Sequence, residues 1–310
     1  MDPAGTGSAL PTPPEHPRRL VYLGTPEMAV PPLQALHAAG FEIALVVTGA
    51  PKRRGRGGTM TPTPVALEAM ALGIPAAHDV AEATEAGADL GVVVAFGQLI
   101  RRPVLEQLPM VNLHFSLLPR WRGAAPVERA ILAGDERTGV CVMAVEEGLD
   151  TGGVYARSEL AIRQSNTAAE LGQQLTAVGS ALLVDTLRAG IGAPEPQVGE
   201  PTYAHKLTGA DRMLDWSRTA EELHRVVRVG GAWTTFRGRR LKVLEASLDG
   251  AGDDLGAAAP GALQGNRVAT GVGALRLLTV QPEGKGPVAA AEWLNGARPA
   301  AGERLGEEAS

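Results

Sequence analysis

The sequence has a single cysteine, Cys141, among 310 residues. One thiol excludes an intrachain disulfide framework and any zinc or iron–sulfur site built from several cysteines. A long apolar run is also missing. The longest, at residues 90–100, is interrupted by Gly91, Gly97 and Gln98 and is too short to span a bilayer. We therefore expect neither a membrane partner nor a disulfide-stabilised secreted fold.

Positive charge is not in excess over the whole chain. Lys and Arg number 29 against 34 Asp and Glu, which gives a formal net charge of −5. An overall basic coat for nucleic acid is therefore absent, although local basic patches remain possible. The shares of hydrophobic residues (45%) and charged residues (20%) are ordinary for a globular protein. The length predicts about two domains.

Both ends and one internal segment have compositions that predict disorder. Residues 1–17 contain five prolines and lack the basic region and apolar run of a secretory signal. We therefore expect a disordered leader and a cytoplasmic location. Residues 249–260 are expected to form a mobile loop, and residues 296–310 are expected to fray.

Residues 18–188 alternate short apolar runs with segments of helical periodicity. The runs are apolar on both faces, as buried parallel strands tend to be. This alternation predicts an α/β fold with a Rossmann-like, mostly parallel sheet. Strands are predicted at residues 19–23, 42–47, 90–95, 110–114 and 139–145, and helices at 28–39, 64–72, 126–133 and 167–188.

Residues 189–202 are rich in Pro and Gly and predict a linker between two domains. Beyond it, residues 203–310 have one helical segment followed by short strand-like runs that glycine turns separate. This pattern predicts a small OB-like β-barrel. The helix is predicted at residues 220–229, and the strands at 233–236, 241–246, 261–263, 267–270 and 275–280.

Two segments can carry chemistry. Asn112 and His114 share one face near the carboxyl end of the predicted strand 110–114, where ligands collect in open α/β sheets. An amide beside an imidazole is suited to stabilise a developing oxyanion. Asp150 lies in a glycine-flanked loop after the strand 139–145, and a neighbouring carboxylate can orient an imidazole for proton transfer. Taken singly, the two segments also fit a satisfied histidine and a turn aspartate.

Other chemistries fit these residues less well. Ser116, His114 and Asp150 can be drawn as a hydrolase triad, but the G-x-S-x-G elbow is missing and Ser116 lies only two residues from its base. Gly24-Thr25-Pro26 lacks the G-x-G-x-x-G turn of a dinucleotide site. The sequence has neither an H-E-x-x-H motif nor the paired Cys/His spacing of a zinc site.

Over residues 19–280 the sequence resembles the methionyl-tRNA formyltransferase family. The Asn-x-His pair with Gly-Leu-Asp-x-Gly is similar to the wider folate-dependent formyltransferase superfamily. The string Trp-Arg-Gly-Ala-Ala-Pro and the C-terminal matches favour the tRNA branch. The matching segments are 23–26, 55–57, 94–97, 112–114, 116–126, 148–152, 203–207 and 215–217.

The resemblance implies transfer of a formyl group from 10-formyltetrahydrofolate to the α-amine of methionyl initiator tRNA, without a metal. Asn112 and His114 would stabilise the oxyanion of a tetrahedral intermediate, and Asp150 would assist proton transfer. Residues 18–188 would form the catalytic domain and residues 203–310 the tRNA-binding domain of a monomer. The implied folate-binding residues are Phe96, Gly97, Ser116, Leu117, Leu118 and Pro119.

The local charge pattern fits a tRNA partner. The loop at residues 48–61 holds Lys52, Arg53, Arg54 and Arg56 and no acidic residue, and we predict that it contacts tRNA phosphates. Residues 206–245 contain nine Lys and Arg and five Asp and Glu, so the local net charge is 9 − 5 = +4. A solvated loop and a solvated barrel face would show the same bias.

Two alternatives stay open. One is a folate-dependent N-formyltransferase for a small amine, such as an amino-sugar nucleotide or a purine precursor. The other is a catalytically silent RNA-binding protein. The sequence also departs from the family: Phe115 stands where relatives often have a small residue, residues 228–233 form a shorter stretch, and residues 1–17 have no counterpart.

Overall fold

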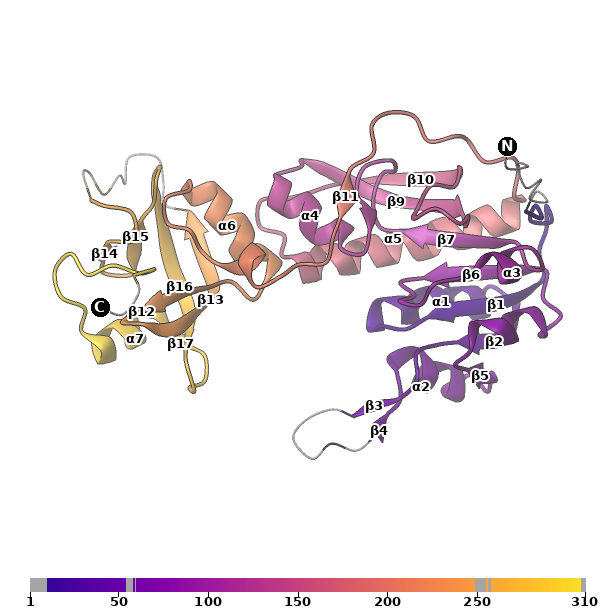
Figure 1. Ribbon diagram of the computed structural model, residues 1–310, viewed down its shortest axis with the longest axis horizontal. Coiled ribbons are helices and arrows are strands. Elements are labelled where there is room, and N and C mark those ends of the chain that lie inside the picture. The colour runs from indigo at the N-terminus through magenta and orange to yellow at the C-terminus, as the bar shows by residue number, and fades with distance from the viewer. Residues whose placement is uncertain (1–9, 54–57, 59, 249–254, 256–257, 308–310) are drawn as a thin grey trace, which may run out of the picture. The chain divides into compact units, whose positions relative to one another are not determined.

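The computed structural model describes residues 10–53, 58, 60–248, 255 and 258–307. The chain divides into two compact units (Figure 1). The N-terminal unit comprises Met1–Pro126, Arg137–Ala161 and Gly172–His205. The C-terminal unit comprises Val127–Glu136, Ile162–Leu171 and Lys206–Ser310.

The N-terminal unit is built on a seven-stranded sheet in the order β10-β9-β7-β6-β1-β2-β5. Its five strands from β7 to β5 are parallel, whereas β9 is antiparallel to β7 and β10 is antiparallel to β9. The predicted mainly parallel α/β sheet is thus confirmed, while β5 and β10 were not predicted. The strands are β1 (Arg19–Gly24), β2 (Glu42–Val47), β5 (Ala76–Ala77), β6 (Leu90–Val94), β7 (Met110–His114), β9 (Arg137–Ala144) and β10 (Val154–Ala161).

The four helices predicted in residues 18–188 are found to within a few residues, whereas η2 and α3 were not predicted. Pro64 opens α2, and the Thr63 hydroxyl accepts a hydrogen bond from the backbone N–H of Ala66 at 3.1 Å, which caps that helix. Gly73 then ends it at φ +69°, in the left-handed region that favours glycine. The helices up to residue 189 are η1 (Glu27–Ala29), α1 (Val30–Ala38), α2 (Pro64–Ala71), η2 (Val80–Thr84), α3 (Arg102–Leu105), α4 (Pro126–Ala133) and α5 (Ala168–Ala189), and η3 (Ala210–Arg212) and α7 (Ala290–Ala297) follow in the C-terminal unit.

The strand that carries the candidate site is held between its neighbours and a helix. A Cβ atom at Gly179 of α5 would lie 3.1 Å from a methyl group of Leu113 and 3.4 Å from one of Val140. The glycine therefore lets α5 pack closely over β7 and β9. Leu113 and Val140 are fully or almost fully buried, so the contact with α5 holds the strand next to His114 in place.

The C-terminal unit has an antiparallel sheet in the order β12-β13-β16-β15-β14, with β17 paired to β16. The helix α6 (Ala220–Val229) begins with a capping box, in which Thr219 and Glu222 each accept the other's backbone N–H. The predicted strand-rich domain is confirmed as an antiparallel sheet domain. Its strands are β12 (Trp233–Phe236), β13 (Arg239–Leu248), β14 (Leu263–Gln264), β15 (Arg267–Ala269), β16 (Ala274–Pro282) and β17 (Val288–Ala289).

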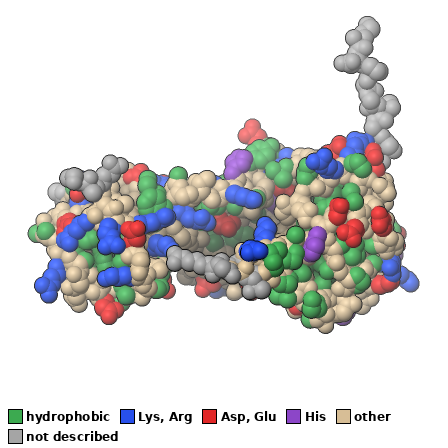
Figure 2. Space-filling view, turned by 60° about the horizontal axis from the view of Figure 1, so that its bottom comes forward, with side chains coloured by type: hydrophobic (Ala, Val, Ile, Leu, Met, Phe, Trp, Pro, Cys, Tyr) green, Lys and Arg blue, Asp and Glu red, His purple; other side chains and the backbone are tan. Residues whose placement is uncertain are grey.

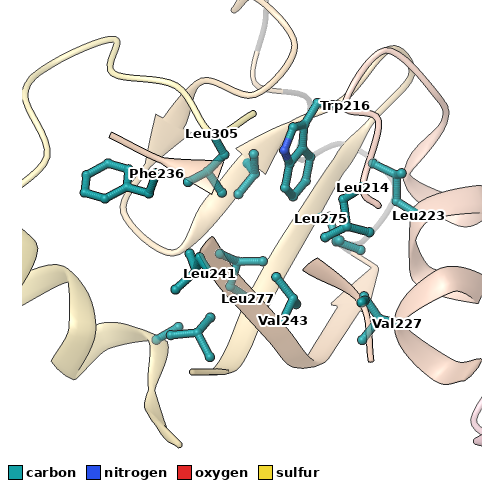
Figure 3. Close-up of a cluster of buried hydrophobic side chains, with 14 of the residues drawn as sticks. Leu214, Trp216, Leu223, Val227, Phe236, Leu241, Val243, Leu275, Leu277 and Leu305 are labelled. Carbon is teal, nitrogen blue, oxygen red and sulfur yellow. The ribbon is translucent and has the colours of Figure 1, made fainter. Parts of the chain in front are cut away.

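Apolar side chains from the sheet and α6 form the core of the C-terminal unit (Figure 3). Trp216 is 4% exposed, and its indole N–H donates to the Thr234 hydroxyl at 3.0 Å. Leu305 joins this core, and its backbone N–H donates to the Gly261 carbonyl at 2.8 Å. The fraying predicted from residue 296 is therefore wrong for residues 300–307, since one docked leucine outweighs the polar composition around it.

Two other predictions of disorder fall partly on residues outside the described set. Residues 1–9 of the predicted leader and most of residues 249–260 are not described. Residues 10–17 differ from the prediction, because Leu10 packs against an apolar cluster of the N-terminal unit and the Glu15 carbonyl accepts from Ile191 N–H at 2.7 Å. Of the helices in the described ranges, none is both long and apolar enough to cross a bilayer.

Candidate functional site

The structure brings the predicted histidine and aspartate together. His114 ends β7, and its Nδ1 lies 3.7 Å from Oδ2 of Asp150, with the two side chains only 6% and 15% exposed. Nε2 of His114 lies 2.9 Å from the carbonyl oxygen of Trp121. A carbonyl oxygen can only accept, so Nε2–H donates this bond and Nδ1 is the nitrogen that faces the carboxylate. The pair becomes an ion pair when the imidazole is protonated.

Asp150 is held by the backbone of its surroundings. Its Oδ2 accepts the N–H of Gly123 at 2.7 Å, which points the carboxylate toward the segment after β7. Its own backbone has φ +52°, a left-handed conformation that is uncommon for a residue with a side chain. A Cβ atom at Gly152 would lie 2.1 Å from the Ala144 carbonyl oxygen, so the loop can pass the end of β9 only with glycine there.

Asn112 is placed on the same strand as His114, two residues earlier. Its backbone pairs with Val93 of β6 and Met143 of β9. Because side chains alternate along a strand, Asn112 and His114 point to the same face of the sheet. The Asn112 side chain is half-buried, and its amide has no hydrogen-bond partner within the described ranges of the chain. An unpaired amide on that face is free to donate to a bound group.

Three of the predicted folate-binding residues use their side chains inside the protein. The buried Ser116 hydroxyl donates to the Arg120 carbonyl at 2.6 Å and stabilises the turn after β7. Leu118 packs in a buried cluster with Cys141, Met143 and Val154. Leu117 covers Gly139 of β9, where a Cβ atom would lie 2.5 Å from a Leu117 methyl group.

The other predicted folate-binding residues lie at two strand ends. Pro119 follows a cis peptide bond in the same turn. Phe96 follows β6 and is half-buried against the apolar cluster that also contains Val145. Space around Gly97 is open, since no atom lies within 4 Å of where a Cβ would stand.

A cavity of about 470 Å³ adjoins the loop that carries Asp150. This volume is in the usual range for small-molecule sites. None of the predicted folate-binding residues lines it. Burial raises the pKa of the Tyr155 phenol at its wall, and the Glu146 carboxylate raises it further. Its lining is Leu10, Pro11, Thr12, Pro13, Leu105, Pro109, Met110, Ala144, Val145, Glu146, Glu147, Gly148, Tyr155 and Pro194.

The predicted basic loop contains a short hairpin in the structure. Lys52 and Arg53 form β3 (Lys52–Arg53), which pairs with β4 (Met60–Thr61), and both side chains are exposed. Arg54 and Arg56, the other two predicted tRNA contacts, lie outside the described residues. The structure therefore places two of the four cations on a solvent-facing hairpin of the N-terminal unit.

The C-terminal unit has its own basic surface. Figure 2 shows Lys and Arg side chains over the visible face of this unit, at the left of the view. Some of them are engaged within the unit: Arg237 pairs with Glu303 at 2.6 Å. The guanidinium of Arg240 lies 4.3 Å from the ring centre of Trp233. This cation–aromatic pair lies on the β12–β13 edge of the sheet.

Gln197, which was not predicted as a site residue, contacts the loop of Asp150. Its side-chain amide donates to the carbonyl oxygens of Asp150 and Gly152, each at 2.8 Å. Gln197 lies in the Pro/Gly-rich stretch predicted to be a linker. A single glutamine there gives no periodicity or motif that could have identified it.

Comparison with family models gives two matches that follow each other along the chain. A model described as formyl transferase matches residues 18–187. A model described as formyl transferase, C-terminal domain, matches residues 206–298. Among the groups formed by described residues, none has three or more His, Cys, Asp or Glu side chains that could hold a metal ion.

Curated proteins and solved structures are similar over most of the chain. The methionyl-tRNA formyltransferase of Roseobacter denitrificans is 43% identical over 90% of this chain and 95% of its own length. The N-formyltransferase of Helicobacter canadensis, solved with folinic acid and dTDP-3-aminofucose, has a TM-score of 0.63 at 15% identity, covering 83% of this chain and 98% of its own. HypX of Aquifex aeolicus, solved with tetrahydrofolic acid, has a TM-score of 0.64 at 18% identity. The match covers 93% of this chain and spans about half (48%) of HypX.

Proposed function

The chain belongs to the methionyl-tRNA formyltransferase family, and from this premise we propose how its residues transfer a formyl group from 10-formyltetrahydrofolate to the α-amine of methionyl initiator tRNA. Folate-dependent formyl transfer is the activity of the family. The contact of His114 with Asp150 at the end of β7 supports the catalytic roles proposed for these residues. Asn112 lies on the same strand as His114.

The chemical step begins with attack of the methionine amine on the formyl carbon. A C–N bond forms, the carbonyl oxygen becomes an oxyanion, and a tetrahedral intermediate results. The Asn112 amide and the protonated His114 imidazole would donate hydrogen bonds to this oxyanion. His114 would use its Nδ1–H, whose nitrogen lies 3.7 Å from Oδ2 of Asp150, because its Nε2–H already donates to the Trp121 carbonyl. A donor of this kind typically contributes ~10²–10³ in rate.

Collapse of the intermediate breaks the bond between the formyl carbon and N10 of the folate. The attacking amine loses one proton and N10 gains one, so the protons balance over the whole transfer. Asp150 would accept the proton from the amine, directly or through a water molecule, while it holds His114 in place. The buried position of both side chains supports this role, because exclusion of water strengthens their interaction.

We propose that formyl-folate binds at the carboxyl ends of β6 and β7, where ligands collect in open α/β sheets. Phe96 is half-buried after β6, and the space around Gly97 is open. The backbone of residues 116–119, which follows His114, would contribute on the other side of the ligand.

We propose that tRNA is held through its phosphates by exposed cations. The hairpin cations Lys52 and Arg53, with Arg54 and Arg56, would form one contact region. The basic face of residues 203–310 would form the second. Contacts of this type fix the position of the nucleic acid and depend on salt.

The decisive experiment supplies the purified full chain with 10-formyltetrahydrofolate and methionyl initiator tRNA, an amino-sugar nucleotide or a purine precursor. We expect formylation of the tRNA and negligible turnover of the small amines. Formylation of a small amine alone would replace the tRNA assignment with that of a small-molecule N-formyltransferase. Absence of turnover with every acceptor would point to a silent RNA-binding protein.

A further inference from the structure

Residues 194–204 lie against both loops of the candidate site, all within the N-terminal unit. We call these residues the strap. Its first contact is with the start of β10, where Glu195 and Val154 exchange backbone hydrogen bonds of 2.8 and 2.9 Å. Its last contact is a short parallel pairing of β11 (Tyr203–Ala204) with β8 (Arg122–Gly123). The strap is therefore anchored at both ends.

The middle of the strap is tied by one side chain to the loop of Asp150. The Gln197 amide nitrogen donates to the carbonyl oxygens of Asp150 and Gly152, each at 2.8 Å. The Gln197 amide oxygen accepts from Nη2 and Nε of Arg122 at 2.7 and 3.1 Å. Both the nitrogen and the oxygen of the Gln197 amide therefore make hydrogen bonds. The carbonyls of Asp150 and Gly152 belong to the turn that orients the Asp150 carboxylate.

The strap also holds the loop that follows β7. The Thr202 hydroxyl accepts the backbone N–H of Trp121 at 2.9 Å. The Thr202 carbonyl accepts the N–H of Arg122 at 2.8 Å, and the Ala204 carbonyl accepts the N–H of Ala124 at 2.9 Å. Trp121 is the residue whose carbonyl binds Nε2 of His114. One segment therefore fixes the backbone partner of His114 and the backbone of Asp150.

We propose that Gln197 is a positioning residue that sets the contact between Asp150 and His114, and that the strap is part of the catalytic centre's framework. The inference rests on the proposed roles of these two residues. Gln197 would not touch a substrate. It would act through Asp150, by satisfying two loop carbonyls that would otherwise be free to turn away, and misplacement by about 1 Å can cost about 100-fold in rate.

The test uses the full chain with three substitutions. Gln197→Ala removes both halves of the amide. Gln197→Glu keeps oxygen acceptors for Arg122 but cannot donate to the two carbonyls, so it isolates the donor half. Val198→Ala is the matched control, because Val198 is the next strap residue and is 86% exposed.

We expect both Gln197 variants to lower kcat by about 10- to 100-fold. The KM for formyl-folate and for tRNA should stay within about twofold, since only a transition-state interaction is lost. Hydrogen exchange of the amides in residues 148–153 should become at least ~10-fold faster in both variants, as expected for a loop that opens more readily. Val198→Ala should match the unchanged protein in every measurement.

The proposal is overturned if Gln197→Glu keeps the original kcat and exchange rates, because the donated hydrogen bonds would then be dispensable. It is also overturned if the Gln197 variants raise KM at unchanged kcat, which would assign Gln197 to binding. Hydrogen exchange needs no turnover. If the unchanged protein formylates no acceptor, the proposed function fails, while the exchange rates still decide whether Gln197 holds the loop.

Discussion

The two regions assigned to chemistry and to tRNA are built in opposite ways. The centre at the end of β7 consists of buried groups, with His114 6% and Asp150 15% exposed and each tied to backbone atoms. The cations of the β3–β4 hairpin are exposed on a short two-stranded element. Bond making needs groups held to fractions of an ångström, whereas phosphate binding needs only charge within reach. Substitutions should therefore have large, specific effects in the first region and small, salt-dependent effects in the second.

The largest effect is expected at the buried pair. His114→Ala and Asp150→Ala should each lower kcat by roughly 10²–10⁴, because a positioned acid–base group contributes about that much. The binding of tRNA should change little, which a direct titration of tRNA can measure. His37→Ala, a loss of an exposed histidine at the end of α1, is the control. Near-normal turnover of the His114 or Asp150 variant would contradict the expectation that substitutions in the buried centre have the larger effects.

A second large effect is expected in the core of the C-terminal unit, on stability rather than chemistry. Trp216→Ala should destabilise this unit by about 3–5 kcal/mol, since a buried indole is replaced by a cavity. Trp216→Phe should cost less, because it keeps an aromatic ring and loses mainly the hydrogen bond to Thr234. Urea unfolding of the full chain, followed by circular dichroism, measures both. Equal costs would mean that the hydrogen bond, not packing, dominates there.

A smaller effect is expected at the hairpin. Lys52→Ala or Arg53→Ala should reduce the slope of log affinity for tRNA against log salt by about 0.7–0.9 each, the release expected for one phosphate contact. The value of kcat should not change. Met60→Ala trims an exposed side chain of the same hairpin without altering charge, and it should leave the slope intact. An unchanged slope in the cation variants would exclude these residues from the tRNA contact.

The smallest effect is a pH dependence at the start of α6. The N–H of Thr219, and then Arg218, lower the pKa of Glu222 to about 2 from 4.5. A lowered folded-state pKa stabilises the fold above pH 4.5, and this contribution is lost as the pH falls through about 2. The stability difference between the unchanged protein and Glu222→Gln should therefore shrink over that window. Urea midpoints at several pH values measure this difference.

Glu221→Gln is the matched control for that titration. Its carboxylate is 72% exposed and lies 3.9 Å from the guanidinium of Arg225. Its stability difference should be small at every pH, because an exposed pair contributes little. A pH dependence equal to that of Glu222→Gln would mean that general surface charge, not the cap, is responsible.

Most of the elements could be predicted because their signals are local. The predicted strand 110–114 and the helices 126–133 and 220–229 agree with β7, α4 and α6 residue for residue. The strand β10 was missed because the segment has no long apolar run, and after Val154 all of its residues are half-buried or exposed. The docking of Leu305 was missed for a different reason: one buried residue among glycines and glutamates has no periodicity.

The candidate site could be predicted only in part. Asn112 and His114 share a strand, so their common face follows from the alternation of side chains. Their approach to Asp150 was inferred from a resemblance, and nothing in the local sequence fixes it. The cavity lined by residues 10–13 and 144–148 was not predicted, because it joins segments far apart in the chain.

The sequence by itself determined most of the strands and helices and the residue types available for chemistry, because these depend on periodicity and on neighbours along the chain. Only the tertiary structure decided that β9 runs antiparallel to β7 and that its following loop returns to His114. It also decided that a Pro/Gly-rich segment supplies Gln197 to that loop. Such contacts join residues 30 to 50 positions apart, and they form only when packing of the whole unit offsets the entropy lost in bringing them together.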